Sequence, residues 1–346
     1  MKKIFVLLLL TMLFSTASFS QGNDGKPVLK FNQKGKFRIV QFTDLHFQYK
    51  SDISDSTLAL MRSVIASEKP DLVVLTGDIV TSEHTQKAWN SLSQTFIDAK
   101  VPWTIVLGNH DIEEKMTGKE IMEFVGKMPY NLTSNGPDYV SGNGNYVLNI
   151  LSSNSSKTET VLYFLDSHSS FPKKHEFEGY DWIQGDQIYW YRSESGTFTN
   201  NNGGKPMNAL AFFHIPLQEY KEVLGKSTTI GSQKEGISCS SVNPGLFAAM
   251  LDTKDVMGIF VGHDHNNNFI GCLHHICLAF GNVTGRDGYG DIGKGARIID
   301  LYEGARKFDT WILKMYDCDR DKGTWTPVTG EREMYRVSYP KSFVEK

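Results

Sequence analysis

The sequence predicts an α/β fold in which two mixed β-sheets pack together and are flanked by helices. In the first third of the chain, apolar runs alternate with segments of helical periodicity in the order β-α-β-α-β, which favours parallel strands joined by right-handed crossovers. Further apolar runs follow, and short, closely spaced ones near the C-terminus are typical of antiparallel strands. A chain of 346 residues is long for one domain but suits a large α/β enzyme.

The first third supplies three strands whose ends carry polar residues. Strands are expected at residues 36–42, 72–75 and 103–107, and helices at 57–66 and 85–99. Asp44, Asp78 and Asn109 each follow one of these strands closely. The carboxyl ends of parallel strands form the usual crevice for ligands in open α/β sheets. These three side chains are therefore expected to converge there.

The rest of the chain supplies the second sheet and the closing strands. Strands are expected at residues 146–151, 161–165, 209–213 and 257–261, and antiparallel strands at 269–270, 275–280, 296–301 and 310–314. A helix with an aromatic face is expected at 181–192, and loops at 131–145 and 194–206. The glycine-rich run 285–295 is most simply a turn, and the alternative is a loop of the substrate cleft.

The N-terminus has the pattern of a secretory signal peptide. Lys2 and Lys3 precede an apolar run, and the small residues Ser18 and Ser20 predict cleavage before Gln21. We therefore expect a signal peptide at 1–20, a single mature domain at 21–346, and an exported protein, periplasmic or secreted. The alternative is an uncleaved anchor, although the run is shorter than the roughly 20 residues of a membrane span. No later stretch is apolar enough to span, so stable membrane insertion is not expected.

Charge and cysteine content exclude some function classes. The formal charge of the whole chain is −3 and becomes more negative when the leader lysines are removed. This balance disfavours a general nucleic-acid or anionic-membrane binder. The spacing of Cys272 and Cys277 allows a local bridge across a hairpin, and the alternative is that they are small buried apolar residues. No Cys-x-x-Cys pair is present, which disfavours a thiolate zinc site.

Five short blocks carry residues that bind metals. The blocks are Thr43-Asp44-Leu45-His46, Gly77-Asp78, Gly108-Asn109-His110-Asp111, Phe213-His214-Ile215 and Gly262-His263-Asp264-His265. A lone Gly-Asp or His-x-His is common by chance, whereas all five in one chain are a strong signal. The predicted metal ligands are Asp44, His46, Asp78, Asn109, His214, His263 and His265. This mixture of carboxylate, amide and imidazole suits a pair of divalent ions.

The ligands divide naturally between two ions. Asp78 is the expected bridging carboxylate, and Asn109 contributes a neutral oxygen. The first ion is expected to be held by Asp44, His46 and His265, and the second by His214 and His263. In an extended segment two residues apart point to the same side, so His263 and His265 are expected to reach different ions. Asp264 is interpreted as a residue outside the ligand set.

This set of charges favours hydrolysis of an anionic ester. Two ions, two carboxylates and a bridging hydroxide leave roughly one net positive charge, which attracts a phosphate. The hydroxide is expected to attack phosphorus in line. His110 is predicted to be catalytic, donating to the leaving-group oxygen or to an equatorial oxygen. Asp111, also placed in the catalytic set, is expected either to orient His110 or to cap a helix that begins near Glu113.

The five ordered blocks resemble those of the calcineurin-like metallophosphoesterase superfamily across residues 37–301. Segments 209–216 and 262–266 further resemble a branch similar to purple acid phosphatases. The resemblance implies a metallophosphoesterase-type sandwich, a dinuclear metal site and phosphoester hydrolysis. True purple acid phosphatases carry a tyrosine where this chain has Thr81, and they lack a histidine ligand at His46. A ferric-tyrosinate centre is therefore not expected, and the departure favours two divalent ions of Mn, Zn or Fe.

The first functional hypothesis is an exported, metal-dependent phosphatase or phosphodiesterase that acts on a small phosphoester. The alternative is a catalytically silent protein of the same fold that binds a phosphorylated ligand. The complete ligand set favours the enzyme. A nuclease is disfavoured because the chain lacks a basic stripe with interleaved aromatic residues, so no nucleic-acid partner is expected. The sequence gives no indication of the oligomeric state or of a choice between monoesters and diesters.

Overall fold

The computed structural model describes residues 25–170, 179–319, 324–327 and 335–338. The predicted signal peptide and its cleavage point lie outside these ranges. Within them, no helix combines the length and the apolar character needed to cross a membrane.

Among the described residues, the first sheet has seven strands in the order β12-β11-β10-β1-β2-β3, with β13 paired to β11. Its strands are β1 (Lys36–Phe42), β2 (Leu72–Thr76), β3 (Trp103–Val106), β10 (Lys294–Tyr302), β11 (Lys307–Asp319), β12 (Thr324–Pro327) and β13 (Tyr335–Ser338). The neighbours β1, β2 and β3 are parallel, as predicted, whereas β10 and β11 are antiparallel to their partners.

The second sheet has six strands in the order β4-β5-β6-β7-β9-β8. Its strands are β4 (Tyr146–Leu151), β5 (Thr158–Phe164), β6 (Asn208–Phe212), β7 (Val256–Val261), β8 (Ile270–Leu273) and β9 (Ile276–Phe280). The strands β5, β6, β7 and β9 are parallel, while β4 and β8 pair antiparallel at the two edges. Two mixed sheets therefore form the fold, which confirms the predicted class.

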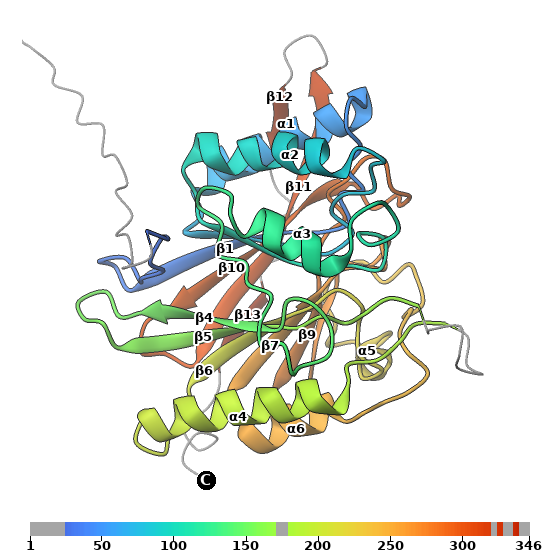
Figure 1. Cartoon of the computed structure of the whole chain (residues 1–346). Helices are drawn as coiled ribbons and strands as arrows, with labels where there is room; N and C mark the ends of the chain where they lie inside the picture. Colours follow the sequence, from blue (N-terminus) through green and yellow to red (C-terminus); the bar gives the residue numbers. More distant parts are fainter. Residues whose placement is uncertain (1–24, 171–178, 320–323, 328–334, 339–346) are drawn as a thin grey trace, which may run out of the picture.

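Helices cover the outer faces of both sheets (Figure 1). They are α1 (Asp52–Glu68), α2 (Thr85–Ala99), α3 (Gly118–Val125), α4 (Gly185–Asn201), α5 (Tyr220–Val223) and α6 (Leu246–Thr253). In β5, Leu162 and Phe164 belong to the core shared with the first sheet, while Val161 and Tyr163 belong to the core under α4 and α6. Successive residues of a strand point to opposite faces, so one strand contributes to both cores.

Two helices differ in their bounds from the prediction: α1 is longer at both ends than 57–66, and α4 begins and ends later than 181–192. The first helix begins at Asp52 because the Ser51 side chain accepts a hydrogen bond from the Ser54 amide and caps its N-terminus. The predicted loop at 194–206 is wrong over its first part, since α4 continues to Asn201. Ser195 is buried and Phe198 packs against the core under α4. Tertiary packing therefore stabilises a helix that its polar sequence does not indicate.

The expected local bridge between Cys272 and Cys277 is confirmed. The two cysteines form a disulfide and lie directly opposite each other in the β8–β9 hairpin.

Candidate metal centre

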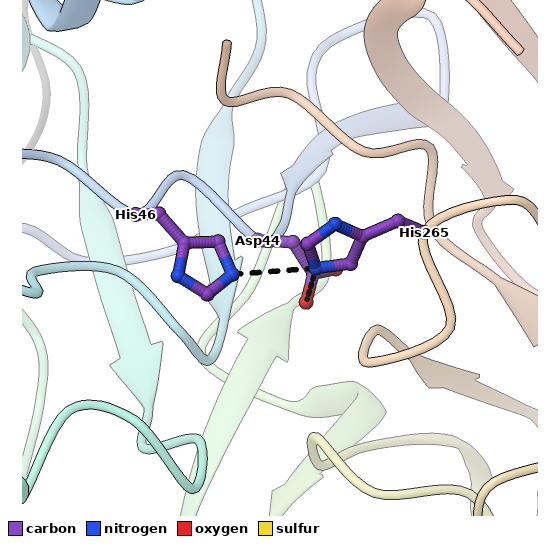
Figure 2. A group of neighbouring side chains, drawn as sticks. All are labelled: Asp44, His46 and His265. Atoms are coloured by element: carbon purple, nitrogen blue, oxygen red, sulfur yellow. Dashed lines mark hydrogen bonds and ion pairs between the residues drawn. The ribbon is translucent and has the colours of Figure 1, made fainter. Parts of the chain in front are cut away.

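The predicted ligands lie in the loops that follow strands of both sheets. Asp44 and His46 follow β1, Asp78 follows β2, His214 follows β6, and His265 follows β7. Their side chains form two groups, in each of which the candidate ligand atoms lie within 4.8 Å of one another. We call Asp44, His46 and His265 cluster one (Figure 2), and Asp78, His214 and His263 cluster two. The histidines and Asp44 divide between the two clusters as the sequence analysis expected, and Asp78, the expected bridge, lies in cluster two.

Asp78 lies between the two clusters. Its Oδ2 atom is 3.2 Å from Nε2 of His214 in cluster two and 3.8 Å from Nε2 of His46 in cluster one. Its other oxygen, Oδ1, accepts the backbone amide of His110 at 2.9 Å. One oxygen is therefore fixed by the backbone while the other faces both clusters, which is the geometry that a bridging carboxylate requires.

Backbone carbonyls set the orientation of two imidazoles. Nδ1 of His214 lies 2.8 Å from the carbonyl of Thr76, and Nδ1 of His265 lies 3.0 Å from the carbonyl of Tyr289. Because a carbonyl only accepts, each Nδ1 must donate. Each Nε2 is then left to face its cluster, the arrangement common for histidines that bind metals.

Pairs of histidine nitrogens face each other at short distances in both clusters, which is informative about what the clusters can bind. Nε2 of His46 is 3.3 Å from Nε2 of His265, and Nδ1 of His263 is 3.2 Å from Nε2 of His214. Two nitrogen lone pairs at such distances repel each other unless a proton or a cation lies between them. Oδ1 of Asn109 is buried and has no hydrogen-bond partner within the part of the chain that the structure describes. Such an acceptor costs about 1–3 kcal/mol, so these residues fit a pair of cations.

The glycine of three blocks makes room for a ligand of another block. A Cβ atom added at Gly77 would collide with His214, and one at Gly108 would collide with Asp78. A Cβ atom at Gly262 would meet Asp44 and Thr43. The blocks therefore interlock, and each glycine is required by close packing across the centre.

The sequence prediction assumed an extended backbone for the loop that carries His263 and His265. In the structure, the loops that carry the ligands contain left-handed residues instead. Asp44, His46, Asp78 and His263 have φ angles of 52°, 45°, 50° and 81°, in the left-handed region. Asp and His enter this region more readily than most residues, yet each instance costs on the order of 1–3 kcal/mol. His263 and His265 still reach different clusters, but through a left-handed turn and not through the period of a strand.

Burial and mutual charges shift the pKa values of these groups. Burial alone would raise the pKa of Asp44, but His265 and His214 lower it to about 2. The pKa of Asp78 is also below its ordinary value, because His214 and His46 outweigh the effect of burial. Burial opposes a charge on His214, yet Asp78 raises its pKa to about 10. Burial and the neighbouring His214 lower the pKa of His263 to about 3.

His110 lies at the outer side of cluster one. Its ring centroid is 5.4 Å from that of His46, and its side chain is 42% exposed. Its Nδ1 is 2.8 Å from Oε2 of Glu113. The imidazole is therefore accessible beside the clusters and has a carboxylate partner that the sequence did not indicate.

Both roles predicted for Asp111 are wrong. Its buried carboxylate accepts backbone amides of Gly108, Ile79 and Val80 at 2.8, 2.7 and 2.9 Å. The partner of His110 is Glu113, and the next helix, α3, begins at Gly118 behind a cap from Thr117. Asp111 instead ties the loop after β3 to the loop after β2, and burial and Asp78 raise its pKa to about 7.

A family model described as calcineurin-like phosphoesterase matches residues 37–267. The chain belongs to the calcineurin-like phosphoesterase family. A protein named probable inactive purple acid phosphatase 29, from Arabidopsis thaliana, is 35% identical over 318 residues, covering 82% of this chain and 81% of that protein. Phosphatase DCR2 from Saccharomyces cerevisiae is 33% identical, covering 81% of this chain and 53% of that protein.

Solved structures agree with the family at the level of the fold. A dimetal phosphatase from Danio rerio aligns with a TM-score of 0.58 and 12% identity, covering 88% of this chain and 99% of that chain. A purple acid phosphatase from yellow lupin aligns with a TM-score of 0.51 and 13% identity, covering 92% of this chain and 56% of that chain. The predicted metallophosphoesterase-type sandwich is thus confirmed.

Two tyrosines beside the centre of this phosphoesterase fold were missed by the sequence analysis. The ring of Tyr289 stacks on His265 with centroids 4.0 Å apart, and the ring of Tyr180 meets His263 edge to face at 4.5 Å. The hydroxyl of Tyr289 donates to Glu235 at 2.5 Å. The available signal for Tyr289 was an aromatic residue inside a glycine-rich run, which was interpreted first as a turn and, as the alternative, as a loop of the substrate cleft.

Proposed function

We propose that this chain is an exported, metal-dependent hydrolase of small phosphate monoesters or diesters. The observation that carries the proposal is the pair of complete clusters joined by Oδ2 of Asp78. The leader pattern at residues 1–20 supports export. The nitrogen and oxygen donors suit Mn, Zn or Fe.

The residues divide the work between holding ions and handling the substrate. Cluster one and cluster two would each hold one ion, with Asp78 shared and the Asn109 amide oxygen as a further donor. When bound, two such ions acidify water and offset the charge of a phosphate group. His110 stands outside both clusters and would exchange a proton with the leaving-group oxygen. Glu113, at its Nδ1, would hold the ring in place for this step.

A silent binding protein is the second candidate, and the names of relatives favour it. Three relatives from Arabidopsis thaliana, between 30% and 35% identical, are named as probable inactive purple acid phosphatases. Against it, this chain keeps both clusters complete. The yeast relative is named as a phosphatase.

Turnover after metal exchange separates these two candidates. The purified protein is stripped with a chelator, reloaded with Mn²⁺, Zn²⁺ or Fe²⁺, and assayed with an aryl monoester, an aryl diester and a nucleotide. We expect hydrolysis that needs the metal and disappears in Asp78→Ala. A protein that binds two ions but hydrolyses none of the three would support the silent candidate. Export is tested separately by N-terminal sequencing of the mature protein, which should begin at Gln21.

A further inference from the structure

The glycine-rich run 285–295 contacts cluster one directly. A Cβ atom added at Gly288 would lie 2.8 Å from Cε1 of His265 and 2.9 Å from Cδ2 of His46, so only glycine allows this approach. The next residue, Tyr289, stacks its ring on His265 and accepts Nδ1–H of the same imidazole with its carbonyl. This segment, which we call the 285–295 loop, therefore holds His265 and passes close to His46.

The 285–295 loop is anchored to two other parts of the molecule, the start of α1 and Glu235. Asp287 accepts the hydroxyls of Ser54 and Ser51 at the start of α1. The Tyr289 hydroxyl donates to Glu235, whose other oxygen accepts the amide of Asn266, the residue after His265. The loop therefore has a defined position relative to the histidines that it contacts.

Lys294, near the C-terminal end of the 285–295 loop, contacts the backbone in the middle of the same loop. Nζ of Lys294 donates to the carbonyl of Tyr289 at 3.1 Å and reaches that of Gly288 at 3.5 Å. The amide of Gly285, at the beginning of the loop, donates to the carbonyl of Asp44 at 3.1 Å. Both ends of the loop are thus tied to its point of contact with cluster one.

Cluster two is held differently. His214 is fully buried, and its Nδ1 donates to Thr76, the last residue of the central strand β2. We propose that the 285–295 loop is a positioning element for cluster one, which sets how tightly Asp44, His46 and His265 hold their ion, while the histidines of cluster two are positioned by other parts of the fold. This inference rests on the two-ion centre of the proposed function.

The variant Gly288→Ala tests the inference through metal binding. In the metal-free protein the two imidazoles are ends of side chains and can turn away from the new methyl group. A bound ion fixes the same rings, so the clash then weakens binding. We expect two binding steps for Mn²⁺ in titration calorimetry of the stripped wild type. In the variant, one step should be weakened about 10–100-fold, the range for changes around metal ligands, with the metal-free Tm nearly unchanged.

Gly293→Ala is the matched control. It lies in the same loop with a φ of 81°, and its added Cβ would meet only Cδ of Lys314, at 3.8 Å. It therefore strains the loop backbone without touching a histidine, and both binding steps should stay as in the wild type. Equal weakening in Gly293→Ala and Gly288→Ala would mean that general loop strain is responsible and would overturn the proposal.

Double variants identify which ion is affected. Gly288→Ala added to His46→Ala should change little, because cluster one is already broken. Added to His214→Ala, it should weaken the ion that remains. The reverse pattern, or wild-type affinities in Gly288→Ala, would overturn the inference while leaving the proposed function intact. A wild type that binds fewer than two ions would instead overturn the proposed function itself.

Discussion

The two halves of the candidate metal centre meet at Asp78 but are built by different parts of the fold. In cluster two, His214 is fully buried and is oriented by the last residue of a central strand. In cluster one, the His46 side chain is 15% exposed. Its partner His265 is oriented by Tyr289, which lies on a loop and is itself 55% exposed.

The comparison shows that how firmly a histidine is positioned depends on the carbonyl that accepts its Nδ1–H. The Thr76 carbonyl belongs to a strand paired on both sides, so it moves only if the sheet opens. The Tyr289 carbonyl is held by side-chain contacts of a surface loop. Local opening costs less free energy in such loops than in central strands. We therefore expect the ion of cluster one to exchange first.

Asp78→Ala should have the largest effect, because it removes the group that joins the two halves. We expect the metal content to fall below two ions and turnover to drop by more than about 100-fold, since even outer partners of a metal contribute 10–100-fold. Elemental analysis and a phosphoester assay measure the two quantities.

Asp264→Asn is a suitable control for Asp78→Ala. Asp264 is a buried acid between His263 and His265, and its oxygens lie near the amide of Ser238. We expect this variant to keep two ions. Unchanged two-ion stoichiometry in Asp78→Ala would remove the bridging role and, with it, the reason to treat the clusters as one centre.

His110→Ala tests whether the leaving group departs on the side of cluster one, where this imidazole lies. Turnover should fall by about 10²–10⁴-fold with the metal content intact, the range for general acid catalysis. The loss should be smaller for an aryl phosphate, because its leaving oxygen needs less protonation. Equal losses for good and poor leaving groups would indicate contact with the equatorial oxygens. Full activity on both would show that His110 has no catalytic role.

The fold could be predicted where the hydrophobic period of a segment and the order of helices and strands along the chain determine it. The strands β1 to β3 and their parallel pairing follow from alternating apolar runs and helices. The insertion of β10 beside β1 could not be predicted, because the 36–42 and 296–301 patterns do not specify their neighbours. The extension of α4 was also hidden, since burial of Ser195 and Phe198 depends on packing across the chain.

The candidate site divides in the same way. The side chains that form the clusters were visible because each ends a predicted strand in a recognisable block. The carbonyls of Thr76 and Tyr289 were not, since every residue carries a carbonyl. The role of Asp111 was missed because its amide partners at Ile79 and Val80 lie about 30 residues away in sequence and become neighbours only on folding.

His214→Ala should destabilise the metal-free protein more than His46→Ala, if cluster two is part of the core. Removing His214 leaves Asp78 buried without its nearest ionisable partner, and breaking a buried ion pair typically costs about 3–5 kcal/mol. Removing His46 should cost less, about 1 kcal/mol, because its nitrogen is 3.8 Å from Asp78 and burial lowers the pKa of its imidazole, so the two groups form no close ion pair. Urea unfolding in chelator gives both values, and equal losses would contradict the division into core and surface halves.

Tyr289→Phe should have the smallest effect and probes the anchoring of cluster one alone. The variant keeps the ring on His265 and the backbone carbonyl but loses the hydrogen bond to Glu235. A hydrogen bond to a charged group contributes about 1.5–3 kcal/mol at most, and the exposure of Tyr289 reduces this. We expect the weaker Mn²⁺ step to lose a few-fold in affinity and the stronger step to stay constant.

Tyr189→Phe, which alters a tyrosine 74% exposed on α4, should change neither step. Equal weakening of both steps in Tyr289→Phe would mean that the two halves are coupled through more than Asp78, and that the loop supports the whole centre.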